Sequence, residues 1–154
     1  MRTKLLRWCA PLGLGLMLTA CAQERIREEA QLRARAGDYE RALEGLEAGV
    51  AAHPESALLR SATLQARNEA LARLVSEAAT VRSGGRLDEA QALLQRALRF
   101  DSGGQRVAAL LADVAVERRQ RQSLERAQEL AAANQVDAAL RLLADALKDN
   151  RRQP

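Results

Sequence analysis

A sequence pattern that recurs three times places the strongest constraint on how this chain can fold. The copies begin at Gly37, Gly85 and Asn134, so their spacings are 48 and 49 residues. Glycine adopts most readily the left-handed backbone conformation that ends a helix, and asparagine is the second most favourable residue there. Each copy therefore predicts a turn between two helices, and three such turns predict an all-α chain of three helical hairpins.

Small residues follow each turn at a fixed spacing of seven, where the two helices of a hairpin must approach closely. An apolar residue stands two positions after the turn, and a leucine four positions after the first small residue lies on the same helical face. In chain order these positions are Tyr39, Ala42, Leu46 and Gly49; Leu87, Ala90, Leu94 and Ala97; and Val136, Ala139, Leu143 and Ala146.

Two long stretches without glycine or proline connect the copies. Residues 55–82 and residues 105–133 are each expected to form one long helix rather than an additional hairpin. The apolar stripe expected along the first comprises Leu64, Leu71, Leu74, Val75, Ala78 and Val81, and the stripe of the second begins with Val107, Leu110, Leu111 and Val114. The connecting helices are thus elongated while the apolar face keeps its register.

The repeat pattern resembles the second half of a tetratricopeptide repeat. The matching positions are Gly37, Tyr39, Ala42, Gly49 and Pro54; then Gly85, Leu87, Ala90 and Ala97; then Val136, Ala139 and Ala146. The third copy has Asn134 in place of glycine, and neither later copy has the proline. Tetratricopeptide units repeat every ~34 residues, so the connecting helices here are unusually long for that family.

The amino terminus has the three zones of an export signal. Residues 1–7 carry three bases and no acid, and residues 8–18 are mostly apolar. An apolar helix of that length covers only ~16 Å of a ~30 Å hydrocarbon layer, so a permanent spanning helix is disfavoured. We therefore expect the segment to be removed.

The end of this segment, Leu18-Thr19-Ala20-Cys21, resembles the lipobox of bacterial lipoproteins. That resemblance implies a signal peptide over residues 1–20, cleavage before Cys21 and acylation of Cys21 as a membrane anchor. One repeat domain over residues 21–154 would follow. Ala22, where an aspartate would retain the protein in the inner membrane, implies an outer-membrane location facing the periplasm. The alternative is a plain signal peptide followed by a chance cysteine.

Charge and cysteine content exclude two classes of protein. The net charge of +4 arises largely from the leader, because residues 21–154 hold 21 basic and 20 acidic side chains. With Tyr39 and Phe100 as the remaining aromatic residues, nucleic-acid binding is not expected. Cys9 would leave with the leader, so no disulfide framework is expected either.

Catalytic side chains are scarce. His53 is the one histidine, and it stands before Pro54 at a helix boundary where a polar residue needs no chemical role. A metal cluster or a nucleophile with a histidine base cannot be assembled from it and an acylated cysteine. We expect no enzyme, no metal or other cofactor and no small-molecule substrate, and a binding or scaffolding role instead.

Residues 117–123 interrupt the apolar pattern of the second long helix. One interpretation is a solvated projection or a helix break near Ser123. The other is a basic patch of Arg118, Arg119 and Arg121 that binds a partner or anionic lipid.

Together, the lipobox, the stretched repeat and the Gly85–Ala90 run are similar to the helical N-terminal region of secretin-type outer-membrane lipoproteins of type II secretion and type IV pilus assembly. That resemblance implies an adaptor or assembly factor with a secretin or another envelope component as its protein partner. Two alternatives stay open: a truncated module of a secretin-like channel, and a scaffold for cell-wall enzymes. Leu140, Leu143 and Leu147 are expected to be covered on one side only.

Overall fold

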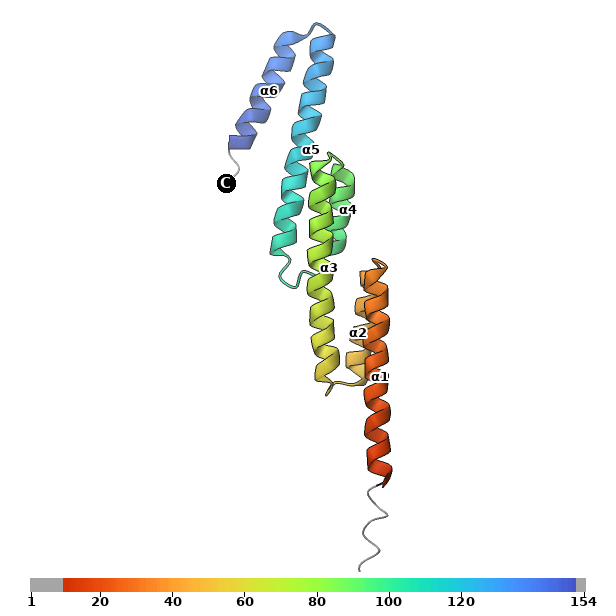
Figure 1. Ribbon diagram of the computed structural model, residues 1–154. Coiled ribbons are helices and arrows are strands. Elements are labelled where there is room, and N and C mark those ends of the chain that lie inside the picture. Colours follow the sequence, from red (N-terminus) through yellow and green to blue (C-terminus); the bar gives the residue numbers. More distant parts are fainter. Residues whose placement is uncertain (1–9, 152–154) are drawn as a thin grey trace, which may run out of the picture. The chain divides into compact units, whose positions relative to one another are not determined.

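The computed structural model describes the backbone of residues 10–151 and the side chains of residues 21–148. Over that range the chain is all-α and forms six helices packed as hairpins (Figure 1). They are α1 (Ala10–Arg35), α2 (Tyr39–Ala52), α3 (Ala57–Ser83), α4 (Leu87–Ala97), α5 (Gln105–Ala132) and α6 (Val136–Arg151). The all-α prediction is confirmed, and so are the two long connecting helices, α3 and α5.

The three predicted turns have the same backbone conformation. Gly37, Gly85 and Asn134 adopt φ values of 80°, 82° and 60°. In each turn the N–H of the following residue donates to a carbonyl five residues back: Asp38 to Arg33 at 3.0 Å, Arg86 to Val81 at 3.0 Å, and Gln135 to Leu130 at 2.8 Å. These are Schellman motifs, which satisfy the carbonyl groups left open at a helix end.

The helix after each turn also begins in the same way. The first small residue of each copy donates its N–H to the residue that follows the turn: Ala42 to Asp38 at 3.1 Å, Ala90 to Arg86 at 3.0 Å, and Ala139 to Gln135 at 3.1 Å. The sequence repeat is therefore a structural repeat of a helix end, a left-handed turn residue and a helix start.

The chain divides into two compact units, residues 1–73 and 74–154, with the boundary inside α3. In the first unit Ala30 of α1, Ala42 and Leu46 of α2, and Leu59 of α3 form the buried core. Gly49 lies at the centre of this packing. A Cβ atom there would stand 3.0 Å from Ile26 Cγ2 and 3.3 Å from Leu59 Cδ1, so the glycine lets α2 approach both neighbours.

The core of the second unit lies where the last turns of α3, α4 and the first half of α5 meet. Its buried apolar residues are Leu74, Ala78, Val81, Leu87, Ala90, Leu93, Leu94, Ala97, Phe100, Val107 and Val114. The predicted stripe of α5 is confirmed at Val107 and Val114. The predicted stripe of α3 is correct from Leu74 onward but wrong at Leu64, which is 62% exposed, whereas Leu59 and Ala70 are buried.

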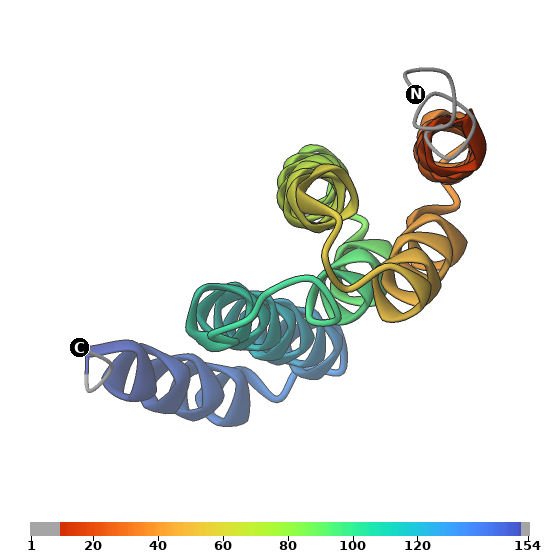
Figure 2. The ribbon, with the colours of Figure 1, turned by 90° about the horizontal axis from the view of Figure 1, so that it is seen from below.

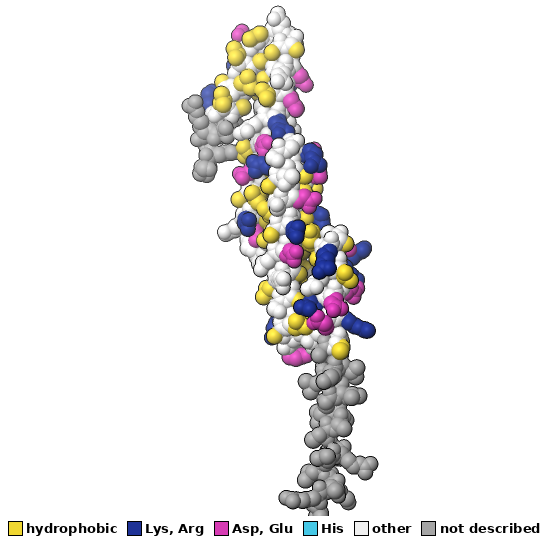
Figure 3. All heavy atoms as spheres, viewed as in Figure 1, with side chains coloured by type: hydrophobic (Ala, Val, Ile, Leu, Met, Phe, Trp, Pro, Cys, Tyr) yellow, Lys and Arg dark blue, Asp and Glu magenta, His cyan; other side chains and the backbone are white. Residues whose placement is uncertain are grey.

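The α5–α6 hairpin is packed on one side only. Helices α5 and α6 lie side by side (Figures 1 and 2), with Ala127 and Ala139 buried in the hairpin. Leu140 and Leu147 remain 60% and 61% exposed and Leu143 is half-buried, which agrees with the expected one-sided covering. Hydrophobic side chains accordingly gather on the surface of this hairpin in Figure 3.

None of the helices in the described part of the chain is long and apolar enough to cross a membrane. The predicted leader falls partly outside the description: residues 1–9 lie outside the described residues, and residues 10–20 are described only as the helical backbone that begins α1. The side chains of Leu18, Thr19 and Ala20 therefore lie outside the described residues.

Candidate partner-binding groove and anchor site

The predicted acylation site lies on a helix next to a packed hairpin. Cys21 is part of α1, and its side chain is exposed with a free thiol. If the chain is cut before Cys21, that residue becomes the first residue of the remaining helix.

A buried serine links Gln23, in the middle of α1, to the α2–α3 loop. The hydroxyl of Ser56, which is 6% exposed, donates to Gln23 Oε1 at 2.8 Å and accepts the N–H of Leu59 at 3.3 Å. The second bond is an N-terminal cap of α3. Sequence reasoning missed Ser56, although a serine directly before a helical apolar run is a recognisable cap signal.

An apolar groove lies within the second unit, between the end of α3, α4 and the first part of α5. It encloses about 380 Å³. Its floor is made of aliphatic side chains from all three helices, namely Val75, Ala78, Ala79, Leu94, Leu110 and Val114, and its rim carries Arg82, Ser83, Glu117 and Arg121. Five of the floor residues, all except Ala79, come from positions that the sequence assigned to the apolar face.

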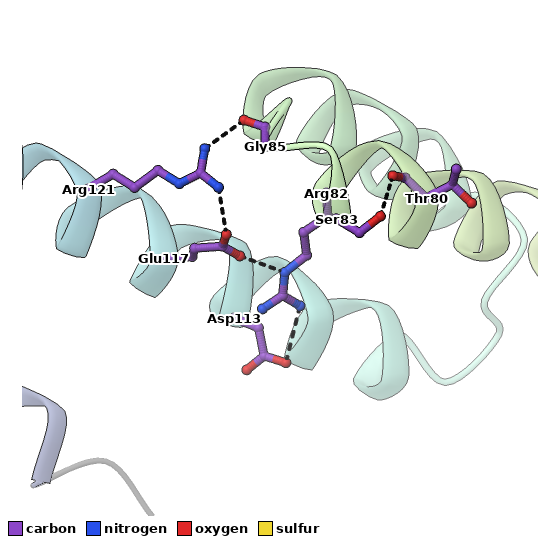
Figure 4. A network of polar contacts seen from close by, with 7 residues as sticks. All are labelled: Thr80, Arg82, Ser83, Gly85, Asp113, Glu117 and Arg121. Carbon is purple, nitrogen blue, oxygen red and sulfur yellow. Dashed lines mark hydrogen bonds and ion pairs between the residues drawn. The ribbon is translucent and has the colours of Figure 1, made fainter.

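Ion pairs close one rim of the groove (Figure 4). Glu117 accepts Arg82 Nε at 2.8 Å on one oxygen and an Arg121 guanidinium N–H at 3.1 Å on the other. Arg82 also lies 3.9 Å from Asp113. Arg121 further donates to the carbonyl oxygen of Gly85 at 2.8 Å, so it links α5 to the turn between α3 and α4.

These contacts act on the ionisation of Glu117. The hydrogen bond from Arg82 is the largest cause that lowers the pKa of Glu117, and the charges of Arg82 and Arg121 lower it further. Partial desolvation opposes them but does not reverse the direction. Glu117 is therefore held as a carboxylate between two guanidinium groups.

The predicted basic patch has its three arginines in different settings. Arg118 pairs with Asp88 of α4 at 2.5 Å, Arg121 belongs to the rim network, and Arg119 is exposed. Helix α5 runs unbroken through Ser123, so the polar segment is not a helix break. The pairing of Glu117, inside that segment, with Arg82 was not predicted, because the two residues are 35 positions apart.

The described side chains offer little for metal binding. His53 Nδ1 lies 3.8 Å from Glu55 Oε1, and no group of three or more His, Cys, Asp or Glu side chains that could hold a metal occurs among the described residues. The groove is lined by aliphatic and ion-paired side chains, so its arrangement suits the binding of an apolar side chain from another molecule.

Comparison with known proteins adds no relative. No protein-family model, no curated protein and no solved structure matches the chain.

Proposed function

We propose that this protein is a lipid-anchored scaffold that binds another protein through the apolar groove of its second unit and catalyses no reaction. Cys21 carries the anchor after cleavage of residues 1–20, and the hairpins are tetratricopeptide-like units with elongated connecting helices. The anchor places the protein on the periplasmic face of the outer membrane.

The groove between α3, α4 and α5 is the observation that carries the proposal. Its volume of about 380 Å³ and its aliphatic floor suit one or two large apolar side chains of a partner. The charged groups at its rim pair with one another, so they impose no strong charge requirement on the partner. An apolar anchor residue in a pocket with a polar rim is the usual arrangement of a protein interface.

The class of partner follows from the resemblance and not from the groove. A lipobox joined to stretched helical repeats is similar to the N-terminal region of secretin-type lipoproteins, so the partner we propose is a component of an outer-membrane secretion or pilus machine. The protein would then act as an adaptor or assembly factor. The exposed Leu140 and Leu147 of α6 offer a second apolar surface on the same unit.

Site-specific photo-crosslinking in cells tests the proposal. A photo-reactive benzoylphenylalanine would replace Ala79, an exposed alanine that lines the groove, or Ala92, an exposed alanine of α4 outside the groove lining. Both variants keep the native leader and are produced in a Gram-negative host that assembles a secretin. We expect a crosslinked product from the Ala79 variant and none from the matched Ala92 variant.

The identity of the product decides between the partner classes. A secretin or pilus component in the crosslink supports the adaptor role, and a peptidoglycan hydrolase would assign the protein to cell-wall enzymes instead. Equal labelling from both positions, or none from Ala79, would remove the groove as the binding site.

A further inference from the structure

The packed part of the first unit begins next to the proposed acylation site. Gln23, two residues after Cys21, already accepts the Ser56 hydroxyl at 2.8 Å. Ile26 then contacts the Gly49 position of α2, and Ala30 lies in the buried core. Two residues span at most ~7 Å even when extended. An acylated Cys21 therefore has almost no slack relative to the hairpin.

The end of the hairpin beside Cys21 is the end with the α2–α3 loop, because Ser56 in that loop bonds Gln23. Residues 51–58 carry a single acid, Glu55, and their exposed side chains include Ala51, Ala52, Pro54, Ala57 and Leu58. The guanidinium of Arg60 donates to the carbonyl oxygen of Pro54 and adds a positive charge beside the loop. A surface of small apolar groups with one cation and one acid is close to neutral, and its apolar groups suit a lipid headgroup layer.

The opposite end of the same hairpin has a different character. Residues 33–41 carry five charged side chains, namely Arg33, Arg35, Asp38, Glu40 and Arg41. Arg33 pairs with Glu29 at 2.6 Å, and Arg41 lies 3.5 Å from Asp38. The Gly37 turn is therefore richer in charge than the α2–α3 loop, although α1 beside that loop also carries Glu24, Arg25 and Arg27.

From this short connection and from the sparse charge of the α2–α3 loop we infer that the loop rests on the lipid headgroup surface into which the acyl chains of Cys21 insert. The first hairpin then stands away from the membrane without a flexible tether, with the Gly37 turn at its far end. The inference rests on the proposed acylation of Cys21. It deepens that proposal by naming the part of the fold that touches lipid.

Fluorescence quenching on vesicles tests the inference. After processing, Cys9 is gone and Cys21 is acylated, so an introduced cysteine is the free thiol to which an environment-sensitive fluorophore couples. Ala57→Cys places the probe on the first residue of α3, directly after the loop, and Ala36→Cys places it in the Gly37 turn at the far end, ~20 Å away along α1. Both alanines are exposed, which makes the variants a matched pair. The full acylated chain is reconstituted into phosphatidylethanolamine and phosphatidylglycerol vesicles that contain a headgroup nitroxide lipid.

We expect the probe at residue 57 to lose most of its fluorescence and the probe at residue 36 to keep most of its own. Equal loss at both positions would mean that the hairpin lies flat, and no loss at either would mean that it is held away from lipid; both results overturn the inference. Mass spectrometry of the same sample separates these outcomes from a failure of the anchor. If the chain is unacylated and keeps its leader, the proposed anchor is wrong. If the chain is acylated but the probe at residue 57 is not quenched, only the proposed contact with the headgroups is wrong.

Discussion

The guanidinium of Arg121, in the middle of α5, donates to the carbonyl oxygen of Gly85, in the turn that follows α3, at a distance of 2.8 Å. This carbonyl lies at the negative end of the α3 helix dipole, where a cation is favourable. The same guanidinium bonds Glu117 at 3.1 Å. Arg121 therefore fastens α5 to the α3–α4 turn at a place where the apolar pattern is interrupted.

Replacing Arg121 by alanine should weaken the second unit. Loss of a bond from a charged donor to a partly exposed carbonyl and carboxylate is expected to lower the free energy of unfolding by about 1 kcal/mol. Arg121→Lys should recover only part, because an ammonium group lacks the planar fork that spans both acceptors. Urea unfolding measures the change. Arg119→Ala, at an exposed position on the same helix, is the control and should change little. Equal losses of unfolding free energy in Arg121→Ala and Arg119→Ala would contradict the stabilising role of Arg121.

The depressed pKa of Glu117 predicts how stability depends on pH. The folded pKa lies below the usual value of 4.5, so the unfolded chain binds a proton first as the pH falls. The stability from the Arg82–Glu117–Arg121 network is thus fully present above the unfolded pKa and is lost as the pH falls through the folded pKa. Urea midpoints measured from about pH 7 to about pH 3 should decline less steeply in Glu117→Gln than in the parent.

Glu125→Gln supplies the control for that titration. Glu125 is exposed on the same helix, and its substitution removes the same charge without touching the network. Its pH profile should follow that of the parent. A Glu117→Gln profile as steep as the parent's would show that the network contributes nothing to acid stability.

The left-handed turn residues predict a graded response to alanine. Gly37→Ala forces a side chain into φ 80° with no atom within 4 Å of the new Cβ, so only the backbone conformation is penalised, by about 1 kcal/mol. Gly85→Ala has the same backbone penalty, and its Cβ would also stand 2.9 Å from an Arg121 nitrogen. We expect Gly85→Ala to be the more destabilising of the two in urea unfolding.

A double substitution isolates the arginine. In an Arg121→Ala background, the loss of unfolding free energy caused by Gly85→Ala should fall to that caused by Gly37→Ala. Only the penalty for a side chain at positive φ then remains. Asn134→Gly should keep or raise stability, since glycine tolerates φ 60° better than asparagine does. A cost of Gly85→Ala that does not change in this background would mean that the arginine plays no part.

Local features of the sequence were enough to predict the turns, the small residues and the two long helices. A left-handed turn residue and an uninterrupted helical run are decided by backbone preferences within a few positions, so Asn134 could be recognised as an equivalent of Gly37 and Gly85. Pairings between distant residues are different. Ser56 with Gln23 and Glu117 with Arg82 depend on which helices meet, and no local periodicity encodes them.

The stripe of α3 illustrates the same limit. Leu64 fits a leucine-only pattern with Leu71, but the helix buries Leu59 and Ala70 instead. Ala70 is buried as completely as Leu59, so a stripe that began at Leu64 left out both buried residues in the first half of the helix. The boundary between the two packed units lies within this same helix, where neither glycine nor proline marks it.

Two glycines of α2 give a matched test of the packing that positions the anchor. A Cβ at Gly45 would meet no atom within 4 Å, so Gly45→Ala should stabilise the first unit by roughly 0.5–1 kcal/mol through helix propensity alone. A Cβ at Gly49 would stand 3.0 Å from Ile26 Cγ2 and 3.3 Å from Leu59 Cδ1, so the same gain at Gly49→Ala is offset because these two side chains must shift. Gly49→Leu should lower the unfolding midpoint strongly, because its side chain has no space between α1 and α3.

The comparison that matters is Gly49→Leu against Gly45→Leu in thermal unfolding. Both place the same side chain on the same helix, so they differ only in what the leucine meets. A large fall in the thermal unfolding midpoint for Gly49→Leu and a small change for Gly45→Leu would confirm that α2 contacts α1 directly within a few turns of Cys21. Similar midpoints for the two variants would mean that α1 is not packed against Gly49. The short connection between anchor and hairpin, on which the lipid-facing loop depends, would then be lost.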